Sequence, residues 1–193
     1  MGSPYEEALD LAGLHPRLRA YFAEIPTGMV GIGVGTFDVV GTTKRWLWPV
    51  LAVLGRQGVL FAHSDRDVPF SVVNEPFGEI LSGRRTFHFA SGDRTMVDLM
   101  SVVDGRLVDD LGGARRYRAW LSAAVADGAI VLRSTRFAVR VFRTYLRIPG
   151  RVVVTERWDE SVGRQHVSAV ITAPIVGRIY EYSGFFDYRI EAL

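Results

Sequence analysis

Apolar and polar residues alternate with a period of two along most of the chain after residue 28, which is the pattern of strands with one buried face. Turn sequences such as Asp104-Gly105 and Asp127-Gly128 interrupt the alternation and are typical of antiparallel hairpins. We predict strands over these ranges: 59–64, 68–73, 79–89, 95–103, 106–110, 117–125, 129–142, 152–158 and two more between Gly163 and Ile190. A short helix is the alternative for residues 116–126, where Ala and Leu are abundant.

Another strand is expected from Met29, before this series, and one of its faces is made only of glycine. Gly31, Gly33 and Gly35 alternate with Val30 and Ile32. A bare face predicts a sharp bend or the close approach of another backbone. The pattern leads into more strand and lacks a third glycine, so it is not a dinucleotide-binding fingerprint.

Helical spacing is confined to the first third of the chain. Ser3, Pro4 and Glu6 predict a capped helix from Pro4 to Ala12. A second short helix follows His15, which is expected to cap it, and ends before Pro26. A third is expected near residues 44–55, with Thr42 or Thr43 as its cap, and we predict that it plugs one end of the β structure.

We therefore expect a mainly β protein: an antiparallel meander of about nine or ten strands. Such a meander hides its edges by closing into a lipocalin-like barrel or a curled half-barrel. The whole chain, 1–193, is expected to be one domain, with a helical segment 1–26 and a barrel-like body 29–193. A barrel of this size can enclose one small ligand.

Composition narrows the possible functions. The 23 Lys and Arg residues nearly balance 21 Asp and Glu, so the net charge is only +2 and no nucleic-acid partner is expected. The chain has no cysteine, which excludes disulfides and thiol catalysis. No cofactor motif and no metal-ligand spacing among the four histidines is present. Without a signal peptide or a long apolar run, we expect a cytoplasmic protein without a cofactor or metal.

Two carboxylates stand out by strand parity. Glu156 shares its phase with Val154 and Trp158, and Asp98 shares its phase with Met96 and Met100. If these phases face the interior, each carboxyl lies in an apolar wall and its pKa rises unless an arginine pairs with it. A raised pKa suits a general acid or base near neutral pH. A structural salt bridge is the alternative for each, and the facing of Asp98 is ambiguous because Val97 and Leu99 are equally apolar.

The last two strands carry the other candidate site residues. Tyr180, Tyr182, Phe186 and Tyr188 share one face, which is either plain core or the wall of a ligand cavity. His166 and Arg164 fall in a more polar phase, where they serve as a polar anchor and a charge partner or lie on the surface. The expected binding residues are Tyr182, His166, Arg164, Tyr180, Trp158, Met96 and Met100.

Several stretches together resemble a bacterial family catalogued as domain of unknown function 4166. They are LHPRLRAYF, GTFDVVGTTKRWLWPVLAVL, DRDVPFSVVN, RTFHF, TMVDLM and GRQHVSAVITAPIVGRIYEYSGFFDYRI. Members of that family stand alone or follow an NAD(P)-binding domain of the saccharopine-dehydrogenase type. The resemblance implies no mechanism and no catalytic residues.

Our leading hypothesis is the binding of a hydrophobic small molecule in the barrel, with cofactor-free cyclase or isomerase activity that uses Glu156 or Asp98. One alternative is a non-catalytic accessory module for an NAD(P)-binding oxidoreductase. Another is peripheral lipid binding through Trp46 and Trp48, although Trp46 and Trp48 fit a plug helix better and no membrane contact is expected. The oligomeric state is left open.

Overall fold

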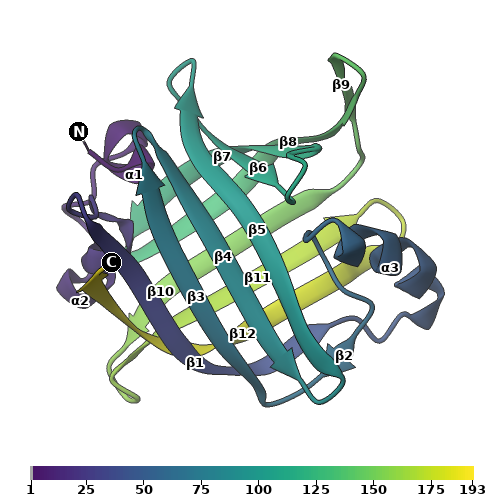
Figure 1. The fold of residues 1–193 in the computed structure, drawn as a ribbon, viewed down its shortest axis with the longest axis horizontal. Helices are drawn as coiled ribbons and strands as arrows, with labels where there is room; N and C mark the ends of the chain where they lie inside the picture. Colours follow the sequence, from purple (N-terminus) through teal and green to yellow (C-terminus); the bar gives the residue numbers. More distant parts are fainter. Residues whose placement is uncertain (1) are drawn as a thin grey trace.

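The computed structural model describes residues 2–193, which form one barrel of strands with short helices at both ends (Figure 1). The helical elements are α1 (Pro4–Ala8), α2 (Pro16–Phe22), the 3-10 turn η1 (Arg45–Leu47) and α3 (Trp48–Arg56). The strands are β1 (Met29–Gly41), β2 (Ser64–Asp65), β3 (Val68–Phe77), β4 (Ile80–Phe89), β5 (Gly92–Val103), β6 (Arg106–Leu111), β7 (Tyr117–Ala126), β8 (Ala129–Val141), β9 (Thr144–Arg147), β10 (Arg151–Asp159), β11 (Arg164–Ala173) and β12 (Gly177–Ala192).

The barrel is closed, so the open half-barrel alternative is wrong. Its ring runs β10-β11-β12-β1-β3-β4-β5-β6-β7-β8, and β8 then pairs with β10 to complete the circle. The closing ladder joins Val153–Glu156 to Ile130–Arg133 in antiparallel register. The strands β2 and β9 lie outside the ring as extensions of β1 and β8. All ten ring strands are thereby paired on both sides.

Strand prediction from the alternation is confirmed at most positions, including β7 where a helix was the alternative. The strand expected at 59–64 is wrong, since only Ser64–Asp65 pairs, with β1. In this segment Val59 N–H donates to Leu54 O of α3, and Gly58 O accepts from Val97 N–H, so no ladder forms. Strand β9 was missed because the turn before it, at Phe142, contains none of the usual turn residues.

The glycine face of β1 looks into the barrel and meets the aromatic strand β12. A Cβ on Gly35 would lie 2.0 Å from the carbonyl oxygen of Phe185, and one on Gly31 would lie 1.5 Å from the hydroxyl of Tyr188. The expected close approach of another backbone is therefore confirmed at Gly35, while at Gly31 an aromatic side chain fills the space.

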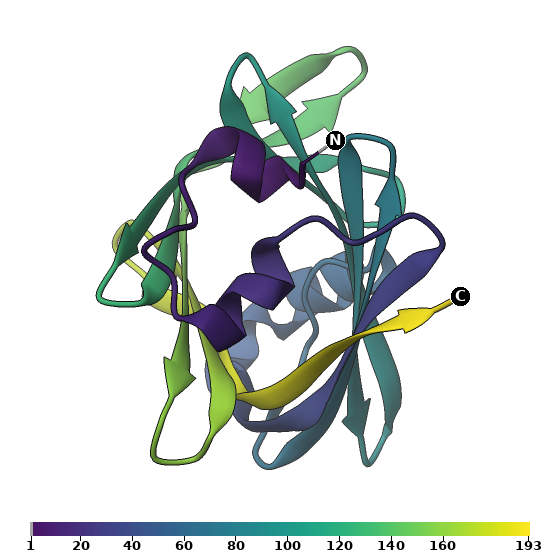
Figure 2. The same cartoon turned by 90° about the vertical axis from the view of Figure 1, so that its left-hand side faces the viewer.

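Helices cover the two ends of the barrel, as Figure 2 shows along its axis. At one end α1 begins with the expected capping box of Ser3 and Glu6, and α2 begins with His15, whose Nδ1 accepts from Arg17 N–H at 3.3 Å. At the other end α3 is the expected plug, with Leu51 buried. It starts late, at Trp48 beside Pro49, and no side chain caps it, so the threonine caps are wrong.

None of the helices in the described residues is long and apolar enough to cross a membrane.

Replacement of Gly35 by alanine tests the close approach of β1 and β12. The new methyl group would collide with backbone atoms that cannot move aside, so we expect Gly35→Ala to lower the free energy of unfolding by about 3 kcal/mol or more. Urea denaturation followed by circular dichroism measures the effect. Gly113→Ala is the matched control, since a Cβ there meets no atom within 4 Å. Equal stability of the two variants would contradict the packing described.

Candidate functional site

Polar side chains from six strands point into the barrel, four of them on the adjacent strands β3 to β6 and two on the adjacent strands β10 and β11. They alternate with the apolar residues of the inner wall, and most are buried. They are Asn74 of β3, Arg85 of β4, Asp98 of β5, Asp109 of β6, Glu156 of β10 and Gln165 of β11. We call these six residues the charge cluster.

Arg85 is the only basic member of the charge cluster and forms an ion pair with Asp98 on the adjacent strand. Gly83, which is paired with Asp98 across the β4–β5 ladder and lies two residues before Arg85, leaves room for the ion pair. A Cβ on Gly83 would be 2.8 Å from an Asp98 oxygen and 3.0 Å from an Arg85 nitrogen. The structural alternative for Asp98, a salt bridge to an arginine, is therefore what the structure shows.

Glu156 is buried, with an exposed fraction of 6%, and has no ion-pair partner among the described residues. Its neighbours across the two ladders are the buried Ile130 and Val167. Gln165 Nε2 donates to Glu156 Oε2 at 2.5 Å. Burial raises the pKa of Glu156 to about 7, against the lowering effects of the Gln165 hydrogen bond and of the Arg85 charge. This carboxyl can therefore carry or release a proton near neutral pH.

Asp109 is a second acid of the same kind. Burial raises its pKa to about 7, while Arg85 opposes the shift and the nearby Asp110 adds to it. Its Oδ1 is buried and has no hydrogen-bond partner among the described residues. A buried acceptor without a donor costs about 1–3 kcal/mol, so this oxygen is the least satisfied atom of the cluster.

Three tyrosines lie near the charge cluster, two of them on α1 and α2 and the third, Tyr182, on β12. Tyr5 of α1 and Tyr21 of α2 are buried, and Arg85 Nη2 donates to Tyr21 Oη at 3.5 Å. Burial raises the pKa of both phenols, and it raises that of Tyr182 to about 12. All three hydroxyls are therefore neutral at physiological pH and able to donate hydrogen bonds.

The barrel interior around these groups holds a dense set of aromatic rings. Phe37 packs on Phe70 and Phe87, with ring centroids 4.3 and 5.4 Å apart. Tyr182 lies 5.8 Å from Phe87, and Phe186 lies 5.8 Å from Phe70. Tyr182 and Phe186 of β12 thus pack with the aromatic rings of the core, and a role of this inner face as the wall of a ligand cavity stays a prediction.

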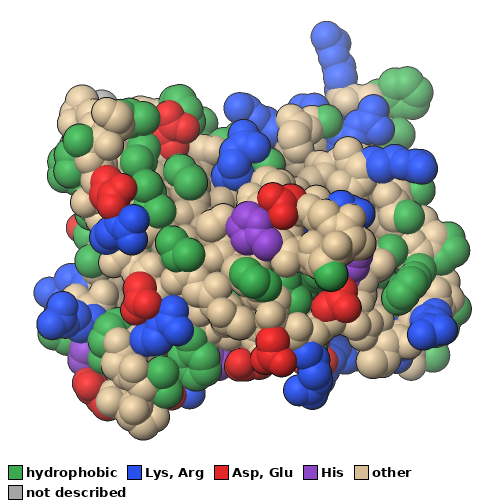
Figure 3. Space-filling model, turned by 60° about the horizontal axis from the view of Figure 1, so that its bottom comes forward, with side chains coloured by type: hydrophobic (Ala, Val, Ile, Leu, Met, Phe, Trp, Pro, Cys, Tyr) green, Lys and Arg blue, Asp and Glu red, His purple; other side chains and the backbone are tan. Residues whose placement is uncertain are grey.

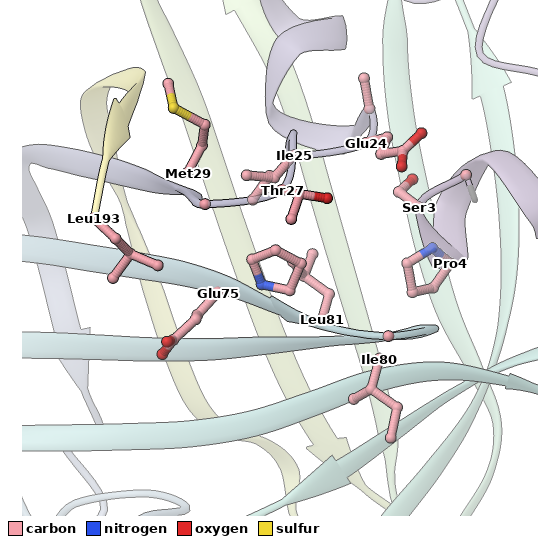
Figure 4. Close-up of a pocket in the computed structure, with 15 residues that line it drawn as sticks. Ser3, Pro4, Glu24, Ile25, Thr27, Met29, Glu75, Ile80, Leu81 and Leu193 are labelled. Carbon is pink, nitrogen blue, oxygen red and sulfur yellow. The ribbon is translucent and has the colours of Figure 1, made fainter.

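A pocket of about 340 Å³ opens beside α1, at the end of the barrel that α1 and α2 cover (Figure 4). The loop from α2 to β1 and the β3–β4 hairpin form its other walls, and it is lined by Ser3, Pro4, Ile25, Thr27 and Leu81, among others. Leu81 lies on the inner face of β4, four residues before Arg85. The pocket is therefore at the barrel end nearest to the tyrosines of α1 and α2, and neither Glu156 nor Asp98 lines it.

The structure brings only some of the sequence-predicted site residues together. Glu156, Asp98, Tyr180, Tyr182, Met96 and Met100 lie on the inner side of the barrel and Trp158 lies at its end, stacked on His15 at 5.6 Å. His166 and Arg164 lie on the outer face of β11. There His166 Nε2 lies 3.0 Å from Ser183 Oγ, and Arg164 pairs with Asp187 at 3.0 Å. They do not reach the charge cluster.

Arg85 and Asp109 were not among the predicted site residues, although the same parity argument could have found them. Arg85 is in phase with Phe87 and Phe89, and Asp109 is in phase with Leu107 and Leu111. Tyr5 and Tyr21 had no such signal, because their approach to the cluster depends on how the helices cover the barrel. No group of three or more His, Asp and Glu side chains among residues 2–193 is arranged to hold a metal ion.

Comparison with known proteins gives a family and no function. Residues 14–186 match the model of the family described as domain of unknown function DUF4166. Neither a search of the curated proteins nor a search of the solved structures found a match.

Glu156→Gln tests the raised pKa of this carboxyl. The folded protein keeps the proton on Glu156 up to about pH 7, whereas the unfolded chain releases it near the usual value of 4.5. The folded state thus binds more protons between these values, and stability falls as the pH rises through this window. We expect the variant to gain roughly 2 to 3 kcal/mol over the wild type between about pH 5 and about pH 8.

Urea denaturation at several pH values measures this difference. Glu79→Gln, a change of an exposed side chain, is the control and should track the wild type at every pH. A constant difference between Glu156→Gln and the wild type across the range would show that Glu156 is ionised in the folded protein.

Proposed function

Because the chain belongs to the DUF4166 family of unknown function, which supplies no activity, we propose from the geometry that its barrel binds a small apolar molecule carrying a hydrogen-bond donor. The observation that carries this proposal is the pair of buried carboxyls, Glu156 and Asp109, whose pKa values are both raised to about 7 in one interior. Perturbed carboxyls of this kind are concentrated at binding and catalytic sites.

The ligand class follows from the surroundings of these carboxyls. Glu156 lies between Ile130 and Val167, and Asp109 lies between Met100 and Ala119 on the neighbouring strands. These four flanking residues are apolar, which favours a mainly hydrocarbon or aromatic molecule. The unpaired Oδ1 of Asp109 accepts a hydrogen bond, so a hydroxyl or amine N–H on the ligand would satisfy it.

Access is proposed through the end covered by α1 and α2. The pocket of about 340 Å³ beside α1 is of a size that holds a small molecule. Helix α1 is only five residues long, and two hydrogen bonds join it to the end of α2 and the loop that follows. Ser3 Oγ donates to Phe22 O, and Glu24 N–H donates to Glu6 Oε2 at 3.0 Å. A small outward movement of α1 would widen this entrance toward Tyr5 and the cluster behind it.

The same groups are suited to proton transfer. A carboxylate with a pKa near 7 removes a proton from a bound molecule, and a neutral carboxyl returns one at another atom, which is the chemistry of an isomerase or cyclase. Asp98 is held as the partner of Arg85, so Glu156 and Asp109 are the two carboxyls proposed for these roles. Arg85 would stabilise negative charge on the ligand, and Tyr21 and Tyr182 would orient it.

The binding proposal is tested with N-phenylnaphthylamine, an apolar dye that carries one N–H and fluoresces when it leaves water. We expect saturable binding, with an affinity about tenfold lower in Asp109→Leu because the buried acceptor is lost. Asp38→Leu changes an exposed carboxylate on the outer face of β1 and should bind as the wild type does. Absence of saturable binding to the wild type, or equal affinities of Asp109→Leu and the wild type, would contradict the proposal.

The entrance is tested by a bulky side chain in the pocket beside α1. Thr27 is exposed and lines this pocket, so Thr27→Trp should fill it without disturbing the core. We expect slower association of the dye in a stopped-flow measurement. The control, Thr43→Trp, changes an exposed threonine next to η1 at the other end of the barrel and should leave the rate unchanged. Equal rates in both variants would place the entrance elsewhere.

A further inference from the structure

Three segments that are distant in the sequence meet at the end of the barrel that carries α3. They are the β8–β9–β10 segment, the β11–β12 turn and the η1–α3 segment, and we call the face they form the α3-end surface. Lys44 Nζ, just before η1, donates to Val176 O of the β11–β12 turn at 2.6 Å. The same turn shares a pocket of about 490 Å³ with Arg147 and Arg151. Figure 1 shows α3 at the right and β9 above it.

The α3-end surface is strongly basic although the whole chain is nearly neutral. Residues 128–155 contain six arginines and no Asp or Glu. All six side chains are exposed, and none of them forms an ion pair with a carboxylate in the part of the chain that the structure describes. They are Arg133, Arg136, Arg140, Arg143, Arg147 and Arg151. Figure 3 shows blue and green side chains together at the upper right edge. Unpaired positive charge of this density attracts an anionic partner.

Two hairpin tips on this surface carry large apolar side chains that are fully open to solvent. Phe142 at the β8–β9 tip is 96% exposed and Ile175 in the β11–β12 turn is 108% exposed. Both have a left-handed backbone, with φ of 54° and 68°. The other non-glycine residues with positive φ are Asp67, Asp104, Arg115 and Asp127, all polar. A bulky apolar residue at such a position is strained and contacts nothing here, so the folded chain alone gives no reason for it.

The η1–α3 segment adds further exposed apolar groups flanked by cations. Trp46 is 65% exposed, Val50 is 60% exposed and Val53 is 50% exposed. Arg45 and Arg56 on the same segment are exposed as well. In contrast, Trp48 is partly buried against the core, and its indole N–H donates to Thr42 O at 3.4 Å. Of the two tryptophans, only Trp46 is therefore available to a partner.

We propose that the α3-end surface binds the surface of an anionic lipid bilayer. The arginines would contact lipid phosphates and carboxylates, while Phe142, Ile175 and Trp46 would enter the interface between headgroups and acyl chains. The aliphatic side chains Ile175, Val50 and Val53 decide between this partner and a nucleic acid, because they offer no stacking surface to a base. The proposal is independent of ligand binding inside the barrel.

Sedimentation of the full chain with vesicles tests this proposal. We expect binding to vesicles of phosphatidylcholine mixed with phosphatidylserine, weaker binding to phosphatidylcholine alone, and loss of binding as salt is added. Arg143→Glu combined with Arg147→Glu should weaken binding by about twentyfold or more, because each positive charge that is removed weakens binding about fivefold. The control, Arg17→Glu combined with Arg106→Glu, makes the same change in charge on exposed side chains of α2 and β6 and should bind as the wild type does.

The apolar tips are tested separately with Phe142→Asn combined with Ile175→Asn. Asparagine tolerates a left-handed backbone, so the fold should persist and vesicle binding should fall. The matched control, Phe77→Asn combined with Val162→Asn, changes exposed apolar residues at the end of β3 and in the β10–β11 turn, away from α3, and should not alter binding.

Three results would overturn the proposal. One is the absence of binding to the mixed vesicles, and another is an equal loss of binding in a control pair. The third is binding of a single-stranded oligonucleotide that needs the arginines but not the apolar tips, which would assign this surface to nucleic acid instead.

Discussion

Closure of the barrel by the β8–β10 ladder is the constraint on which the other features depend. Four residue pairs, Val153–Glu156 with Ile130–Arg133, join the ends of the meander. This pairing leaves the ring without an open edge and separates an inner face from an outer face along every strand. Glu156 is itself part of the ladder, so the same contact that closes the barrel places this carboxyl between two apolar strands.

Burying charged side chains inside a closed barrel costs free energy, so each buried charge needs a physical explanation. Replacing a buried ion pair by apolar residues is often neutral or stabilising, so the Arg85–Asp98 pair is weak support for a purely structural role of the cluster. Two further acids, Glu156 and Asp109, share that interior without ion-pair partners of their own. A stable core would not need these groups, and the proposal that the barrel receives a small molecule rests on them.

The two ends of the barrel differ in chemistry because different connections cover them. At one end α1 and α2 bring Tyr5 and Tyr21 toward the charge cluster and form the pocket beside Ser3 and Leu81. At the other end α3, the β11–β12 turn and the β8–β9 hairpin bring arginines and exposed apolar tips together. The proposed ligand entrance and the proposed membrane contact are thus separate surfaces, which one fold can carry without conflict.

The alternation of apolar and polar residues alone determined the antiparallel strands, the barrel-like class and the apolar phase that Glu156 shares with its neighbours, because side-chain direction along a strand depends only on parity. The facing of Asp98 stayed open, since both phases of its strand are apolar, and so did the choice between a closed barrel and a half-barrel. Parity also separated Tyr182 from Glu181, which lie on opposite faces of β12. It could not show that His166 points away from the cluster, nor which strands are neighbours. Arg85 meets Asp98 only through the pairing of β4 with β5, and the α3-end surface joins segments more than a hundred residues apart. Such contacts depend on strand register, barrel closure and the paths of the connections, so only the tertiary structure decides them.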